Sequence, residues 1–438
     1  MYHVQTYKAW VLVLAAAATL PCSLKATPPA EGAAPNIVLV VLDDVGTDRL
    51  AFYGEGPTPA PTPQLSALAA GGVVFTNAWG SATCTPARAM INTGQYGIHS
   101  GIGSNPDQGG GDGLPLNAQI LPECLSGKYT SVAVGKWHLG DDGQGPYHPN
   151  DSGYALYSGS LKNLNSNPTA EDYFNWQHTI NGTTSWKSVY APTVNINDSV
   201  RAVGNLQEPF FLYLNFNSIH TPLHEPPANL HTQTNLPPDP NDDPIAYVNA
   251  MAEAMDTELG RLLAVLPANT YVIIVGDNGP LGQAVEPPLD PNRVKGTMYQ
   301  GGLRVPLLIS GPGVVPGQAD ALVSVVDLLA TVLELSGVKD LPKSDSVSLV
   351  PYLANTGLSL RSYVYSDRFR PNGKNVQYTF RTRAVRDHRY KLIRRLTSPD
   401  EFYDLQADPY ERTNLIAGGL TTGERAAYGR LSFYMEDL

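Results

Sequence analysis

The fold is constrained most by a series of continuous apolar runs, each about as long as one β-strand. The first is NIVLVVL at 36–42, and similar runs occur at 129–135, 209–216, 270–276 and 303–311. Runs without alternating polar residues are typical of strands that are covered on both faces, as in a parallel sheet. The chain therefore has to supply helices for both faces of one sheet.

Helix signals lie between these runs. The segment 62–72 has Thr before the first turn, Pro at its start and Gly after its end, and 243–266 begins with Asp-Pro. A further helical pattern covers 325–337. This alternation predicts an α/β fold, with a large mainly parallel or mixed β-sheet sandwiched by helices. Pro306, within the fifth run, predicts an edge strand or a bulge there.

The pattern changes toward the C-terminus. Residues 379–395 read as two strands around a tight turn at Asp387-His388, and 401–405 adds a third strand. We therefore predict a small antiparallel α+β subdomain at 341–438, after a larger domain at 27–340.

Two polar segments, 141–205 and 226–244, are unusually long for connections within a compact domain and are predicted to be functional loops. The first contains aromatic residues that could stack on sugar rings or form a small local core. They are Tyr173, Trp176, Trp186 and Tyr190.

The N-terminal run WVLVLAAAATL at 10–20 is too short to span a membrane and is typical of an export signal. We expect residues 1–26 to be a signal peptide and the protein to be exported, to a bacterial periplasm or outside the cell, without a stable membrane anchor. The net charge of -11 argues against a broad nucleic-acid surface, although a local basic pocket could still bind an anion.

Cys84 lies in the polar stretch SATCTPARAMINTG at 81–94. Pro86 suits the first turn of a helix and Gly94 would end it, so Cys84 is predicted at a helix N-terminus, where backbone N–H groups favour anions. Cys124 is expected to be a small core residue, with a disulfide to Cys84 as an alternative.

Ionisable or polar groups follow four of the apolar runs directly. Any one of them could be an ordinary turn residue or a satisfied histidine. Because the carboxyl ends of parallel strands meet at the edge where α/β sheets bind ligands, their coincidence favours a site. The residues concerned are Asp43, Asp44, Lys136, His138, His220, Asp277 and Asn278.

The residue types indicate the chemistry. Asp43, Asp44, Asp277 and Asn278 offer hard oxygen donors, which select Ca²⁺ or Mg²⁺. Cationic groups around such an ion would suit a tetrahedral anion, sulfate or phosphate. These groups are Arg88, Lys136, His138, His220 and Lys295.

The stretch CTPAR resembles the Cys-x-Pro-x-Arg signature of the type I, formylglycine-dependent sulfatases, an arylsulfatase-like family of the alkaline phosphatase superfamily. PNIVLVVLDDVG, VGKWHLG, IHTP, GDNG and KGTMYQGGLRVPLLISGPG occur in the family's order. RDHRYKLI and FYDLQADPYERTNL resemble its C-terminal strands, so the resemblance covers roughly residues 35–415. It implies an alkaline phosphatase-like fold.

The resemblance also implies that a formylglycine-generating maturation enzyme oxidises Cys84 to an aldehyde before the chain folds. Ala87 stands where the family more often has Ser, between the fixed positions of the signature. The implied metal is Ca²⁺, with Mg²⁺ possible. Its implied ligands are Asp43, Asp44, the modified Cys84, Asp277 and Asn278.

The family mechanism implies a role for each remaining group. Asp277 would act as the base on the aldehyde hydrate, and His220 or Lys295 would protonate the leaving alcohol. His138 would take the proton of the second hydroxyl. The hydroxyl on the metal side and the sulfate oxygens would be held by two cations, Arg88 and Lys136.

The expected substrate is a sulfated carbohydrate or an aryl sulfate. A phosphonate monoester or phosphodiester hydrolase of the same superfamily is the nearest alternative, but those relatives tend to place His where Asn278 stands. A non-catalytic protein that binds sulfated glycans is a second alternative.

Overall fold

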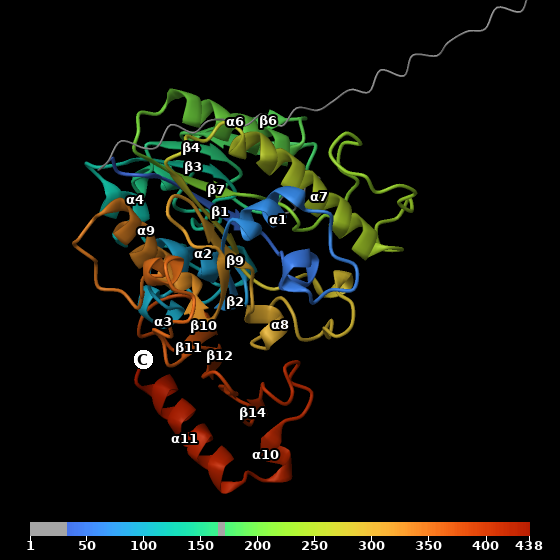
Figure 1. Ribbon diagram of the computed structural model, residues 1–438, viewed down its shortest axis with the longest axis vertical. Coiled ribbons are helices and arrows are strands. Elements are labelled where there is room, and N and C mark those ends of the chain that lie inside the picture. Colours follow the sequence, from blue (N-terminus) through green and yellow to red (C-terminus); the bar gives the residue numbers. More distant parts are fainter. Residues whose placement is uncertain (1–32, 165–170) are drawn as a thin grey trace, which may run out of the picture.

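The computed structural model describes residues 33–164 and 171–438. At its centre lies a ten-stranded mixed sheet, in the order β10-β2-β9-β8-β1-β7-β3-β4-β5-β6 (Figure 1). The strands are β1 Asn36–Leu42, β2 Gly72–Trp79, β3 Thr130–Gly135, β4 Leu156–Gly159, β5 Trp176–Ile180, β6 Thr183–Lys187, β7 Phe210–Asn215, β8 Thr270–Gly276, β9 Leu307–Ser310 and β10 Gly317–Ser324. The block β8-β1-β7-β3-β4 is parallel throughout.

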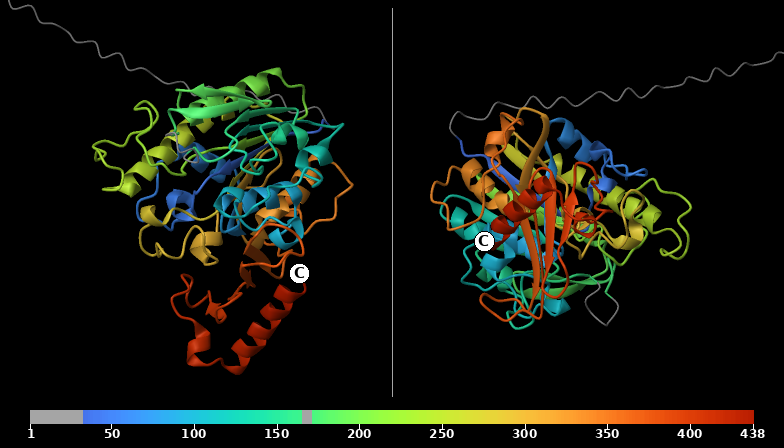
Figure 2. Two further views of the ribbon diagram at one scale, coloured as in Figure 1. Left: turned by 180° about the vertical axis from the view of Figure 1, so that it is seen from behind. Right: turned by 90° about the horizontal axis from the view of Figure 1, so that it is seen from below.

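Helices cover both faces of this sheet (Figures 1 and 2). One face packs against α2 Cys84–Thr93, α4 Leu121–Leu125 and α9 Leu328–Ser336, and the other against α1 Pro63–Ala70, α6 Ala191–Asn205 and α7 Pro244–Leu263. Shorter helices are α3 Gly97–Ser100, α5 His148–Asp151, α8 Gln300–Leu303 and α10 Leu415–Gly418. Single 3₁₀ turns cover Thr47–Arg49, Ala51–Tyr53, Pro106–Gln108, Gly282–Ala284, Val325–Asp327 and Val350–Leu353.

The burial of β1 explains its uninterrupted apolar sequence. Alternate residues such as Leu39 and Val41 enter one hydrophobic core, while Val40 and Leu42 enter the other. A strand in this position has no solvent face, so it carries no polar alternation. The strands expected at 36–42, 129–135, 209–216 and 270–276 and the helices expected at 62–72, 243–266 and 325–337 are confirmed.

The strand predicted at 303–311 is present as β9, but it is shorter than the apolar run, and the edge or bulge expected from Pro306 is wrong. Leu303 is the last residue of α8, and β9 begins only at Leu307 and lies between β8 and β2, antiparallel to both. Pro306 precedes the strand, where its missing N–H costs no ladder hydrogen bond, and its carbonyl accepts from Gly276 N at 2.9 Å. Pro306 therefore marks neither an edge strand nor a bulge.

Most of the segment 141–205 is ordered secondary structure, contrary to the predicted loop. It supplies β4, β5, β6 and α6, which extend the sheet. Tyr173, Trp176 and Tyr190 are buried, so they form a local core, whereas Trp186 is 51% exposed. The segment 226–243 is irregular up to α7, as expected.

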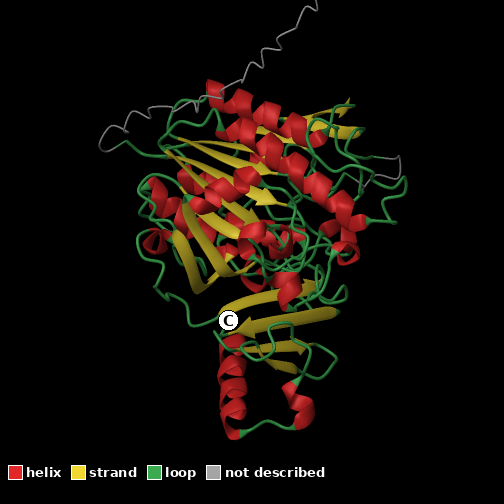
Figure 3. Ribbon diagram, turned by 45° about the vertical axis from the view of Figure 1, so that its right-hand side comes forward, coloured by secondary structure: helices red, strands yellow, loops and turns green. Residues whose placement is uncertain are grey.

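The C-terminal part forms a four-stranded antiparallel sheet, in which the hairpin predicted at 379–395 is confirmed. Its strands are β11 Val364–Arg370, β12 Phe380–Arg386, β13 Tyr390–Arg395 and β14 Glu401–Asp404. The helix α11 Thr422–Glu436 packs on β12 and β13 (Figures 2 and 3). On the other face, Ile393 and Tyr403 pack with Trp79 of the main sheet.

The expected signal peptide lies outside the described residues. No helix that the structure describes is long and apolar enough to cross a membrane.

Candidate active site

The polar residues predicted after the strands lie together at one edge of the main sheet. β1 is flanked by β8 and β7, β7 is flanked by β3, and all of these pairs are parallel. The carboxyl ends of the four strands are therefore neighbours. All of the residues concerned are buried, and α2 brings Cys84 to the same place. They are Asp43 and Asp44 after β1, Lys136 and His138 after β3, His220 after β7, and Asp277 and Asn278 after β8.

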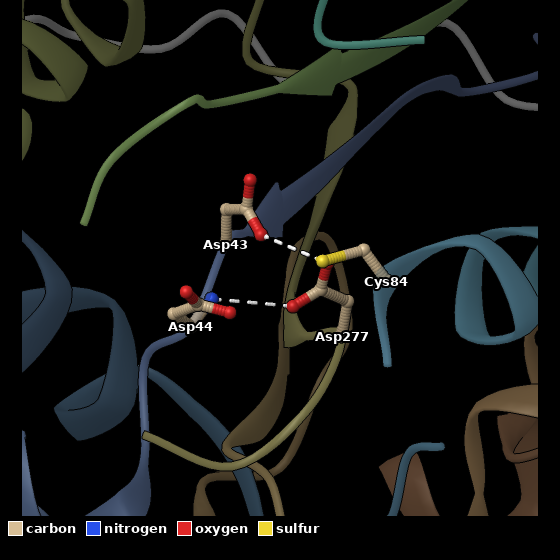
Figure 4. Close-up of side chains that lie close together, drawn as sticks. All are labelled: Asp43, Asp44, Cys84 and Asp277. Atoms are coloured by element: carbon tan, nitrogen blue, oxygen red, sulfur yellow. Dashed lines mark hydrogen bonds between the residues drawn. The ribbon is translucent and has the colours of Figure 1, made fainter. Parts of the chain in front are cut away.

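Four acidic or sulfur-bearing side chains form the centre of this site (Figure 4). One ligand atom from each of Asp43, Asp44, Cys84 and Asp277 lies within 4.8 Å of all the others. Cys84 Sγ lies 3.4 Å from Asp43 Oδ1, and Asp277 Oδ1 accepts from the backbone N of Asp44 at 3.2 Å. The carboxylates thus converge on one point.

Asn278 provides a test of whether this group fits a metal ion. Its amide nitrogen donates to Asp44 Oδ1 at 2.8 Å, while its Oδ1 is buried and accepts no hydrogen bond from any residue the structure describes. A buried amide oxygen without a donor is costly unless something else satisfies it. A hard divalent cation would satisfy this oxygen, and the donor set therefore fits Ca²⁺ or Mg²⁺.

Three cations are paired with the three carboxylates. Lys136 Nζ lies 2.5 Å from Asp43 Oδ2, and Lys295 Nζ lies 2.6 Å from Asp44 Oδ1. Arg88 Nη2 lies 3.0 Å from Asp277 Oδ2. Since these charges balance, a bound divalent cation would make the site positive, which suits an anionic ester.

The two central carboxyl groups titrate differently. Burial and the neighbouring Asp43 charge raise the pKa of Asp277 to about 6. Burial also acts to raise the pKa of Asp43, but Lys136, His220 and Arg88 outweigh it and hold that pKa well below its ordinary value. Asp277 is thus the carboxylate that can carry a proton when no cation faces it.

Both histidines are neutral in this environment. Burial and the charge of Lys136 lower the pKa of His138 to about 4, and burial and Lys295 lower the pKa of His220 to about 4. His220 Nδ1 lies 2.8 Å from the carbonyl oxygen of Thr221. A carbonyl can only accept, so Nδ1 carries the proton and Nε2 is the unprotonated nitrogen.

Helix α2 begins at Cys84 and is ended by Gly94, as the sequence predicted, and this C-cap glycine adopts φ +63°. Thr85 fixes this start, because its backbone N donates to Asn105 Oδ1 at 3.1 Å and its hydroxyl donates to the His138 carbonyl at 2.9 Å. Although its sequence neighbours are polar, Cys84 is fully buried. Burial and the Asp43 charge raise the pKa of its thiol. Cys84 and Cys124 are both free, so the disulfide alternative is wrong.

Close backbone packing sets the position of Lys136. Its backbone N donates to the Asn215 carbonyl at 2.9 Å, and Gly135 adopts φ +90°. A Cβ on Gly135 would lie 1.8 Å from that carbonyl oxygen, so only glycine fits. Asp44 and His138 also have positive φ, of 64° and 56°. Such strained residues cluster at functional sites.

Sequence reasoning missed three residues of this site. Asn215 Oδ1 accepts a hydrogen bond from Arg88 Nη1 at 2.8 Å. Asn215 lies at the carboxyl end of β7, and a polar residue at the end of an apolar strand is the same signal that identified the other site residues. Asn105 precedes the single 3₁₀ turn Pro106–Gln108, within which Asp107 Oδ2 lies 3.5 Å from His138 Nε2. No local pattern marks either of them.

Comparison with known proteins identifies the family. A family model described as Sulfatase matches residues 35–338, and one described as N-sulphoglucosamine sulphohydrolase, C-terminal, matches residues 294–422. The chain belongs to the sulfatase family. The predicted family and fold class are therefore confirmed, and the protein is a sulfuric ester hydrolase.

Relatives of this sulfatase include human arylsulfatase A, 28% identical over 88% of this chain and 84% of that protein. Rat N-acetylgalactosamine-6-sulfatase is 30% identical over 72% of this chain and 64% of that protein. The solved structure of Ps i-CgsB with k-i-k-neocarrahexaose has a TM-score of 0.75 at 25% identity and covers 92% of both chains. A protein bound to its substrate D-glucosamine-2-N,6-O-disulfate has a TM-score of 0.71 at 20% identity, covers 92% of this chain and 97% of its own, and supports the fold.

Proposed function

We propose that this sulfatase hydrolyses the sulfate ester of a carbohydrate, with an aldehyde made from Cys84 as its nucleophile. The observation that carries the proposal is the place of Cys84, fully buried and 3.4 Å from Asp43 in a cluster of metal-type donors. Full burial also supports oxidation by the maturation enzyme before folding, because the folded chain does not expose the thiol.

The chemistry favours an aldehyde over the thiol at this position. The hydrated aldehyde, formylglycine, has two hydroxyls on one carbon. One attacks sulfur, and the bond between sulfur and the ester oxygen breaks, so the alcohol leaves and a sulfated hydrate remains. The second hydroxyl then loses its proton, the bond between carbon and the sulfate oxygen breaks, and the aldehyde and sulfate are released. A thiol has no second hydroxyl and would stay sulfated.

The cation-binding residues are Asp43, Asp44, Asp277, Asn278 and the modified residue 84. A divalent ion, with Ca²⁺ favoured and Mg²⁺ possible, would supply Lewis-acid activation of a hydroxyl and positive charge near the sulfate. Asp277 is the proposed base, because it is the carboxylate of the site whose pKa is raised.

The remaining groups bind sulfate or move protons. Arg88 and Lys136 are buried basic side chains that would hold the nucleophile and the sulfate oxygens. Neutral His138 would accept the proton of the second hydroxyl. The leaving alcohol would take its proton from Lys295 or, once Nε2 of His220 has gained a proton, from His220; both residues lie at the mouth of the site.

The carbohydrate substrate is supported by relatives. The rat relative is an N-acetylgalactosamine-6-sulfatase, and two solved structures of the same fold contain a neocarrahexaose or a sulfated glucosamine. Screening desulfation of a panel of sulfated mono- and oligosaccharides would identify the saccharide, the position of its sulfate and the endo or exo mode.

The proposal is tested by comparing turnover of an aryl sulfate and of an aryl phosphate diester, with Cys84→Ala as the control. We expect multiple turnovers of the sulfate, much slower cleavage of the diester, and no turnover by the variant. Faster cleavage of the diester would favour the phosphodiesterase alternative. No cleavage of either would contradict the proposed chemistry.

We also propose that residues 1–26 are removed on export to a bacterial periplasm or outside the cell, and that the catalytic domain ends near residue 340. N-terminal sequencing of the mature protein should begin near residue 27. Limited proteolysis should cut between 337 and 349, where the chain is irregular, before it cuts elsewhere.

A further inference from the structure

The mouth of the active site opens into a second cavity. The mouth is lined by His220 and Lys295 together with Asp107 and Lys162. Asp107 and Lys162 also line a cavity of about 280 Å³, which His138 borders. A substrate that places its sulfate among the cations therefore extends its leaving group toward this second cavity.

Carboxylates dominate this second cavity, which we call the acidic cleft. Its acidic residues are Asp107, Asp112, Asp141 and Asp142. The lysine of its lining, Lys162, forms an ion pair with Asp142, and Asp107 faces His138 at 3.5 Å, whereas Asp112 and Asp141 form no ion pair with any residue that the structure describes. Such a surface repels a second negative charge and offers acceptors for hydroxyl groups.

Two of these carboxylates are firmly ionised. Asp141 accepts the backbone N–H groups of Gly113 and Gly143, at 2.8 and 2.7 Å, which outweigh its burial and lower its pKa. Burial of Asp107 is likewise outweighed by the neighbouring His138, Lys136 and Lys162, and its pKa is also lowered. The acidic cleft therefore keeps its negative charge at neutral pH.

An independent observation connects the acidic cleft to the reaction. His138 is only 2% exposed, and neither of its ring nitrogens makes a hydrogen bond with any residue the structure describes. Asp107 Oδ2 lies 3.5 Å from its Nε2. A buried, unsatisfied imidazole that borders the cleft indicates that a ligand reaches both His138 and the cleft.

We propose that the acidic cleft binds the sugar of the leaving group through its hydroxyls and excludes a second anion. This inference rests on the proposed function and narrows its substrate class. The substrate is then a sulfated sugar whose neighbouring positions carry hydroxyls, without a further sulfate or carboxylate. A polyanionic glycan would place a like charge against Asp107, Asp112 and Asp141.

The test uses two aryl sulfates of almost equal shape, 4-(carbamoylmethyl)phenyl sulfate and 4-(carboxymethyl)phenyl sulfate. We expect kcat/KM to be about tenfold higher for the uncharged amide at low salt, and the ratio to fall at about 0.5 M salt. Asp112→Asn should lower the ratio, because it removes an exposed carboxylate of the cleft. Lys162→Ala should raise it, because it removes the cleft's cation.

The matched control is Asp340→Asn, an exposed aspartate beyond the C-terminal end of α9, and it should leave the ratio unchanged. Equal use of both esters, or a ratio that neither cleft variant moves, would overturn the inference while leaving the sulfatase chemistry intact. Cleavage of neither ester would instead contradict the proposed function, and the inference with it.

Discussion

Metal binding should weaken as the pH falls below about 6, because the cation must displace a proton from Asp277. Burial and the Asp43 charge raise the pKa of this carboxyl to about 6 in the absence of the ion. A cation binds only the ionised form, so each pH unit below the pKa raises the dissociation constant about tenfold. At pH 5 about ten in eleven molecules carry the proton, and the constant is about elevenfold higher than its limit at high pH.

Other groups near the cation contribute little in this range. The pKa of Asp43 lies well below it, and His138 and His220, with pKa values of about 4, remain largely neutral. The variant Cys84→Ala removes the proton of the nucleophile itself and isolates the effect of Asp277. We expect the protein to release about 0.9 protons to the buffer per bound ion at pH 5 and about 0.1 at pH 7.

The assay is calorimetric titration of Cys84→Ala with Ca²⁺ at pH 5, 6, 7 and 8, in two buffers of different ionisation enthalpy. The difference between the binding heats measured in the two buffers gives the number of protons released per bound ion. A dissociation constant that stays flat from pH 5 to pH 8, without proton release, would refute the raised pKa of Asp277 or its place among the ligands.

Two further predictions concern turnover and stability. Alanine at any one of four positions should lower turnover by about a hundredfold or more with the circular dichroism spectrum retained, and near-normal rates in three of the four would contradict the assigned site. These positions are Lys136, His138, His220 and Lys295. Asp327→Asn should lower the free energy of unfolding by about 3 kcal/mol, because fully buried Asp327 accepts Arg361 Nε at 2.9 Å; urea denaturation measures this. An unfolding midpoint equal to that of Asp340→Asn would contradict the stability prediction.

The part of the site built on the parallel strands could be predicted from sequence. Asp43, Asp44, Asp277 and Asn278 follow apolar runs directly, and parallel pairing brings the ends of such runs to one edge. Asn215, the last residue of β7, lies at the same edge and could have been included.

Residues that reach the site through long-range packing could not be predicted. Asp107 reaches His138 from the 3₁₀ turn Pro106–Gln108, and no pattern in the sequence around Asp107 predicts that contact. The antiparallel insertion of β9 between β8 and β2 likewise depends on pairing with strands that are distant in the sequence. The strand around Trp186 is a different case, because β6 pairs with β5 across the two-residue turn Asn181-Gly182, a local hairpin whose Asn-Gly signal could have been read from the sequence.

The most direct test of the proposed chemistry is the mass of the peptide that contains residue 84 in active enzyme. Conversion of Cys84 to formylglycine replaces sulfur by oxygen and removes two hydrogens, so the peptide should be about 18 Da lighter than the thiol form. The converted fraction should rise in proportion to multiple-turnover sulfatase activity across preparations. A fully active preparation that contains only unmodified Cys84 would contradict the aldehyde nucleophile, even with the fold and family unchanged.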